Sequence, residues 1–112
     1  DFGLVIEKPS DGILQDVHWS EGLFGYFPTY SLGNVYAGCL FEAMQIQMPA
    51  LNENLNSGDL TEAIAWLANS VQKHGSLYSP VDLIQNACGF DITAEPLISY
   101  IEKKFSSTYN LN

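Results

Sequence analysis

Hydrophobic residues recur at three- and four-residue steps over much of the chain, the spacing that places side chains along one face of a helix. The first such run lies between Pro28 and Pro49. Its apolar positions are Leu32, Val35, Tyr36, Cys39, Leu40, Ala43 and Met44. We expect Thr29 or Ser31 to cap this helix. Pro49 would end it or begin a short successor, because proline clashes with the preceding helical turn.

A second helix is predicted from about Thr61 to His74, after a turn signal at residues 56–58. Asp59 or Thr61 would cap its first turn. Gly75 would stop it, because glycine readily adopts the left-handed backbone found at helix C-termini. The apolar stripe predicted for this helix consists of Ile64, Leu67, Ala68 and Val71.

Two more helices follow in the pattern. Ser79 followed by Pro80 is typical of a helix cap with proline at the first helical position, and this third helix would end at Gly89. Thr93 would cap a fourth helix. The stripe of the fourth helix consists of Leu97, Ile98, Ile101 and Phe105. About four helices joined by short loops predict an all-α fold for residues 31–112.

The first thirty residues follow neither a helical nor a strand period. Glycine and proline divide this stretch into short turns, so we predict irregular backbone for residues 1–30. Its aromatic residues include Trp19, Phe24, Tyr26, Phe27 and Tyr30. We expect these rings to be buried, because large apolar groups are costly to leave in water.

The charge balance of the chain limits its partners. Its 112 residues include 13 acidic residues, 4 lysines and no arginine, and the net charge of -9 would repel a nucleic-acid backbone. No apolar run approaches the roughly 18 residues of a membrane span, so we expect no membrane partner.

Only 15% of residues are charged, against roughly 25% in an average domain. We infer that something outside this chain covers part of the surface. The start at Asp1 rather than methionine indicates a fragment or a processed terminus.

The two cysteines, Cys39 and Cys88, lie far apart in apolar helical stretches and form no Cys-x-x-Cys pair. We interpret them as buried, reduced thiols of the kind usual in cytosolic proteins. The cytoplasm is therefore the expected location.

Candidate chemistry is concentrated between residues 15 and 30. The polar and aromatic side chains there are Gln15, Asp16, His18, Trp19, Tyr26 and Tyr30. A carboxylate near a histidine can fix the imidazole tautomer and raise its basicity, and tyrosine hydroxyls can donate hydrogen bonds to a developing oxyanion. The alternative is purely structural: Asp16 and His18 would satisfy buried backbone groups while the aromatic rings, Trp19 among them, pack.

No metal site is predicted within the chain. His18 and His74 are far apart, and neither a His-x-x-x-His pair nor a cysteine-rich pattern is present. Two ligands at Asp16 and His18 alone would bind a metal only weakly.

The run Gly12-Ile13-Leu14-Gln15-Asp16-Val17-His18-Trp19 resembles the G-x-x-Q-D-x-H-W signature of the thermostable carboxypeptidase (carboxypeptidase Taq) family. All five fixed positions are present at the right spacing. Further similarity lies in residues 25–34, 66–67, 73–78 and 100–105, so the resemblance covers nearly the whole chain. It places these residues at the C-terminal end of the catalytic domain of a chain several times longer.

The resemblance implies zinc- or cobalt-dependent carboxypeptidases that remove single amino acids from peptide C-termini and are commonly homodimers. It implies an all-helical fold with a deep groove, like those of neurolysin and angiotensin-converting enzyme, and an active-site-facing segment at residues 1–30. His18 and Tyr26 match the positions that stabilise the transition state. The implied substrate-binding residues are Gln15, Asp16 and Tyr30; Asp16 would also orient His18, and Tyr30 is the alternative second donor.

The chain departs from the family at the metal site. The H-E-x-x-H motif, the downstream glutamate ligand and the arginine expected for the substrate carboxylate are all absent. We therefore expect the 112-residue chain alone to be inactive, with the remainder of the domain supplying these groups. The alternative is a non-catalytic helical module that binds a partner helix in an apolar groove.

Overall fold

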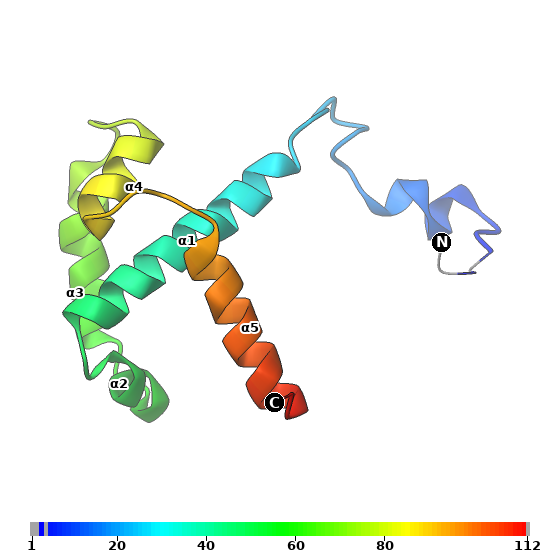
Figure 1. Cartoon of the computed structure of the whole chain (residues 1–112). Coiled ribbons are helices and arrows are strands. Elements are labelled where there is room, and N and C mark those ends of the chain that lie inside the picture. Colours follow the sequence, from blue (N-terminus) through cyan, green and yellow to red (C-terminus); the bar gives the residue numbers. More distant parts are fainter. Residues whose placement is uncertain (1–2, 4, 112) are drawn as a thin grey trace. The chain divides into compact units, whose positions relative to one another are not determined.

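The computed structural model describes residue 3 and residues 5–111, which form helices and turns and contain no strand (Figure 1). Two compact units are present, Asp1–Tyr30 and Ser31–Asn112. In chain order the elements are η1 (Pro9–Asp11), η2 (Ile13–Gln15), α1 (Pro28–Gln47), α2 (Leu51–Ser57), α3 (Thr61–Ser70), η3 (Gln72–His74), α4 (Pro80–Cys88) and α5 (Glu95–Tyr109), where η denotes a 3-10 turn. The all-α fold predicted from the sequence is confirmed.

The ends of α4 lie where the local sequence signals placed them. Ser79 Oγ accepts a hydrogen bond from the backbone N–H of Asp82 at 3.2 Å and donates one to Asp82 Oδ2 at 2.7 Å. Gly89 follows the helix in the left-handed conformation, with φ of 79°. The proline at position 49 also behaves as predicted, since α1 stops before it and the short helix α2 follows.

The predicted cap of α1 is wrong. The helix begins at Pro28, so Thr29 and Ser31 lie inside its first turn. Proline suits this position because the first N–H groups of a helix have no intrahelical partner. The Thr29 hydroxyl instead donates a hydrogen bond of 2.7 Å to the carbonyl of Tyr26, just outside the helix.

The predicted cap of α5 is also wrong. α5 begins at Glu95 after Ala94, so Thr93 stays outside the helix. Pro96 in the first turn needs no N–H partner there, which allows the helix to start without a side-chain cap. The carbonyl of Thr93 accepts a hydrogen bond of 3.4 Å from the thiol of Cys39.

The single helix predicted from Thr61 to His74 is divided in two. Val71, with φ of -123° and ψ of -63°, leaves the helical conformation after α3, and η3 follows. A tighter 3-10 turn is a common end for an α-helix, and hydrophobic periodicity does not distinguish it from a further α-turn. At the start of α3, Asp59 Oδ1 accepts a hydrogen bond of 2.9 Å from the backbone N–H of Thr61, although Leu60 occupies the cap position.

The second unit has two clusters of buried apolar residues. One contains Cys39, Ala43, Ile84 and Cys88, and the other contains Met44, Leu51 and Ala63. Trp66 packs against both clusters and donates a hydrogen bond of 2.7 Å from its indole N–H to Gln47 Oε1. Both thiols are free and buried, which confirms the prediction of buried, reduced cysteines.

The stripes predicted for α3 and α5 are only partly correct. Ile64 is 57% exposed, whereas its neighbour Ala63 is buried. Ile101 and Phe105 on α5 are likewise exposed. Periodicity identifies the apolar face of a helix, but burial requires a neighbouring element to pack on that face.

α5 crosses α1 closely at Gly38 (Figure 1). A Cβ atom at Gly38 would lie 2.9 Å from the backbone nitrogen of Leu97 and 3.0 Å from its Cα. The absence of a side chain at Gly38 therefore allows the two backbones to approach. An open pocket of about 330 Å³ lies at this crossing, and Phe41 and Tyr100 are among its lining residues.

Before α1 begins, the described residues of the first unit form short turns, two of which contain glycines, Gly22 and Gly25, with φ of 75°. The prediction that its aromatic rings are buried is wrong, since Trp19 is 56% exposed and Phe24 is 76% exposed. A stretch of about thirty residues without regular helices surrounds each ring with too few other groups to cover it. In residue 3 and residues 5–111, no helix combines the length and apolar character needed to cross a membrane.

Candidate active site

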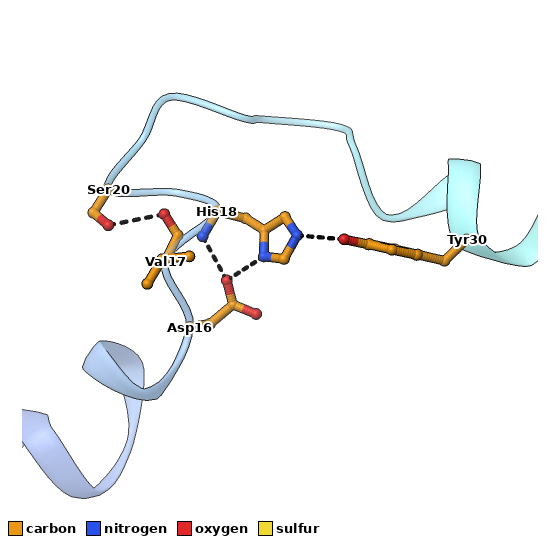
Figure 2. A network of polar contacts seen from close by, with 5 residues as sticks. All are labelled: Asp16, Val17, His18, Ser20 and Tyr30. Atoms are coloured by element: carbon orange, nitrogen blue, oxygen red, sulfur yellow. Dashed lines mark hydrogen bonds and ion pairs between the residues drawn. The ribbon is translucent and has the colours of Figure 1, made fainter.

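His18 lies in a tight turn that directly follows η2. The carbonyl of His18 accepts a hydrogen bond of 2.8 Å from the N–H of Leu23. Ser20 Oγ donates one of 2.9 Å to the carbonyl of Val17, which Figure 2 shows. Gly22 provides the left-handed backbone within this turn. The chain then reaches α1, whose first turn carries Tyr30. The fold thus brings residues 16–30 into one compact site.

Asp16 binds His18 through one carboxylate oxygen. Asp16 Oδ1 accepts the backbone N–H of His18 at 2.7 Å and lies 2.8 Å from His18 Nδ1. Two hydrogen bonds from His18 lower the pKa of Asp16 below its ordinary value. The bond from the backbone N–H has the larger effect, and the bond from the imidazole has the smaller one. The carboxylate therefore remains ionised as the acceptor for His18.

Tyr30 binds the opposite nitrogen of the imidazole. Tyr30 Oη lies 2.9 Å from His18 Nε2 (Figure 2). An ionised carboxylate only accepts hydrogen bonds, so neutral His18 carries its proton on Nδ1, facing Asp16. Nε2 then accepts the hydroxyl proton of Tyr30. The three side chains form one hydrogen-bonded row, from Asp16 through His18 to Tyr30.

Three aromatic rings surround the imidazole of His18. The ring centroid of Phe27 lies 4.8 Å from that of His18, and those of Tyr26 and Tyr30 each lie 5.7 Å from it. These rings leave the His18 side chain only 20% exposed, although most of the surrounding segment is exposed. In the described chain, Tyr26 meets His18 through its ring, whereas the hydroxyl contact to His18 comes from Tyr30.

Two other predicted residues make different contacts. The Gln15 side-chain amide donates a hydrogen bond to the carbonyl of Ser10. Trp19 stacks on Phe24, with centroids 6.5 Å apart and an interplanar angle of 21°. Ile13, Trp19 and Phe27, together with Gly12 and Asp16, line a pocket of about 240 Å³. In the sequence, Phe27 stands out only as one of several aromatic residues. Its position directly before Pro28, where α1 begins, is the one local signal of its placement.

A metal site is not formed by these residues. Residue 3 and residues 5–111 contain no group of three or more His, Cys, Asp or Glu side chains placed to hold a metal ion. Asp16 Oδ1 and His18 Nδ1, two atoms of the kind that can bind a metal, contact each other instead. What the row offers chemically is a histidine of fixed tautomer, a tyrosine hydroxyl at its far nitrogen and a second tyrosine beside both.

Known proteins of similar sequence and structure are carboxypeptidases. Carboxypeptidase 1 of Bacillus subtilis is 38% identical over 110 residues, which are 98% of this chain and 22% of that protein. Thermostable carboxypeptidase 1 of Thermus thermophilus is 36% identical over 108 residues, 96% of this chain and 21% of that protein. The solved structure of a Pyrococcus furiosus carboxypeptidase matches with a TM-score of 0.80 and 34% identity, covering 92% of this chain and 21% of that one.

The all-helical fold and these matches define a helical segment similar to part of known carboxypeptidases. The family model described as carboxypeptidase Taq (M32) metallopeptidase matches residues 1–105, and the chain belongs to this family. It spans about a fifth of the length of its curated relatives. The resemblance seen at Gly12–Trp19 is confirmed, and these relatives do not favour the alternative of a non-catalytic interaction module.

Proposed function

We propose that this chain is part of a metal-dependent carboxypeptidase that hydrolyses the C-terminal peptide bond of peptides. Residues 1–30 would line the active site, and residues 31–112 would form a helical part of the same catalytic domain. One observation carries the proposal: Asp16 and His18 of the family motif form a hydrogen-bonded row with Tyr30.

His18 and Tyr26 are the proposed transition-state stabilisers. Negative charge develops on the carbonyl oxygen when the peptide bond is attacked, and hydrogen-bond donors aimed at that oxygen lower the barrier. Asp16 would hold His18 in place through its contact with Nδ1, and Nε2 would donate to that oxygen when both ring nitrogens carry a proton. Removing one such donor typically costs about 2.7–4 kcal/mol in the transition state.

The two tyrosines would act differently. Tyr30 Oη is engaged by His18 Nε2, so its proton is already committed in this arrangement. Tyr26 lies beside the pair, with its ring centroid 5.4 Å from that of Tyr30. We propose that Tyr26 donates to the substrate, while Tyr30 holds Nε2 until substrate displaces it. Gln15, Asp16 and Tyr30 would contribute to the wall of the substrate site.

The divalent metal implied by the family, zinc or cobalt in this proposal, would be bound elsewhere in the longer protein, because the described residues offer no ligand set that fits it. A cation for the substrate carboxylate would also come from elsewhere, since the chain has no arginine. The 112-residue chain by itself is thus expected to be inactive.

We propose that the longer protein is a homodimer, on the basis of the family resemblance. A cytoplasmic location is proposed because both cysteines are free thiols.

Amino-acid release from a peptide by the longer protein tests this proposal. The complete coding sequence would be expressed, loaded with zinc or cobalt and assayed on peptides with free and with amidated C-termini. We expect release only from free C-termini. His18→Ala should lower kcat with little change in KM, whereas His74→Ala, the matched loss of the other histidine, should have little effect. Equal turnover in wild type and His18→Ala would refute the role of His18.

A further inference from the structure

The closest ring to the His18 imidazole belongs to a residue without hydrogen-bonding atoms in its side chain, Phe27. Its centroid lies 4.8 Å from that of His18, with an interplanar angle of 39°. The rings of Tyr26 and Tyr30 are each 5.7 Å away. Phe27 therefore makes the tightest ring contact with His18 while contributing no polar group to it.

Backbone geometry holds Phe27 firmly in this position. Its carbonyl accepts the backbone N–H of Tyr30 at 3.0 Å, a bond of the first turn of α1. Pro28 fixes the backbone immediately after it, because the proline ring restricts φ. Tyr30, which binds His18 Nε2, lies in the same turn. The start of α1 thus presents both the hydroxyl and the neighbouring ring to one imidazole.

The two hydrogen bonds of His18 restrain the imidazole at its nitrogens, but they do not by themselves keep water from competing for those nitrogens. A ring that packs beside the imidazole, here tilted by 39°, makes its dispersion contacts in this one orientation and excludes water from that side. The His18 side chain is only 20% exposed, whereas Phe24 in the same segment is 76% exposed. Phe27 therefore adds a packing restraint on the imidazole to the two polar restraints of the hydrogen-bonded row.

We propose that Phe27 is a positioning residue, which packs on the His18 imidazole and keeps Nδ1 directed at Asp16 and Nε2 at Tyr30. The catalytic consequence rests on the proposed function, but the orientation of the imidazole does not. Phe27 touches no reacting atom in this scheme; it acts through His18.

The orientation is tested by NMR on the 112-residue chain, whose two histidines make the imidazole signals simple to assign. Imidazole ¹⁵N shifts should show His18 protonated on Nδ1, with His74 as the internal reference. In Phe27→Leu we expect His18 to become a mixture of tautomers, while Phe27→Tyr, which keeps a ring, should retain the wild-type state. Phe24→Leu is the matched control and should change nothing at His18.

The outcomes separate this inference from the proposed function. Identical His18 signals in wild type and Phe27→Leu, or a mixed tautomer already in wild type, would overturn the positioning role. In the longer enzyme, Phe27→Leu should lower kcat about tenfold with little change in KM, below the roughly 10²-fold that a misplacement of about 1 Å can cost. It should also change the pH dependence of kcat, and Phe27→Tyr should restore both. A changed tautomer in a protein without carboxypeptidase activity would refute the proposed function and leave the positioning role of Phe27 intact.

Discussion

The hydroxyl of Tyr30 lies 2.9 Å from Nε2 of His18, so a hydrogen bond joins two side chains that are twelve residues apart in sequence. The same nitrogen is the one that we propose to face substrate. This contact must therefore break, or be replaced, when a carbonyl oxygen occupies the site. The relationship makes the two neighbouring tyrosines experimentally distinguishable.

Tyr26→Phe and Tyr30→Phe should differ in the longer enzyme. Loss of a direct donor typically lowers kcat by about 10²–10³-fold, which we expect for Tyr26→Phe. Tyr30→Phe removes a supporting hydrogen bond worth about 1 kcal/mol, so we expect a loss of less than about tenfold. Steady-state kcat and KM for both variants provide the comparison. A larger loss in Tyr30→Phe than in Tyr26→Phe would exchange the two roles.

The Asp16–His18 contact should persist into acid. The two hydrogen bonds from His18, that of the backbone N–H first, lower the pKa of Asp16. A carboxyl group with a lowered pKa in the folded state stabilises that state above its ordinary pKa of about 3.9, and this stabilisation is lost as the pH falls through the lowered value. The backbone amide signal of His18, followed by NMR during acidification, should have its midpoint below about 3.9, and Asp16→Asn should abolish the transition. A midpoint above that ordinary value would contradict the geometry.

The α1–α5 crossing should not accept a side chain at Gly38. Gly38→Ala places a methyl group 2.9 Å from the backbone of Leu97, and this overpacking should cost about 1–3 kcal/mol of unfolding free energy. Gly33→Ala is the matched control in the same helix, because a Cβ there meets nothing within 4 Å. That change should stabilise α1 by roughly 0.5–1 kcal/mol. Urea denaturation measures both, and equal effects of the two alanines would argue against the close crossing.

Cys88 should react slowly with alkylating reagents. Burial first, then the nearby groups Cys39 and Glu42, raises the pKa of the Cys88 thiol to about 11. A thiol whose pKa is raised on folding weakens the folded state as the pH rises above its unfolded value of about 8.5. The Cys39→Ala variant leaves Cys88 as the one cysteine of the chain. In this variant, iodoacetamide at about pH 8, near the pKa of an unfolded thiol, should modify Cys88 slowly in buffer and rapidly in urea. Rapid modification in buffer would show that Cys88 is more accessible than the fold implies.

Local sequence signals were sufficient for several parts of the fold. Pro49 limits α1, and Ser79 and Gly89 mark the two ends of α4, because each acts through its own backbone geometry or through a hydrogen bond to a near neighbour. The motif at Gly12–Trp19 was likewise readable as a pattern of residue types, and it identified the family.

The sequence by itself determined the helical class, several helix limits and the residues that carry the candidate chemistry, since these depend on local backbone preference and side-chain type. Tertiary structure decided which of those residues meet. It paired the hydroxyl of Tyr30, rather than that of Tyr26, with His18, and it placed Phe27 against the imidazole. It also made position 38 too close to Leu97 for any residue but glycine. It also left the aromatic rings of the first unit exposed and buried Ala63 in place of Ile64. Such contacts depend on how distant parts of the chain are arranged in space, and hydrophobic periodicity carries no information about that arrangement.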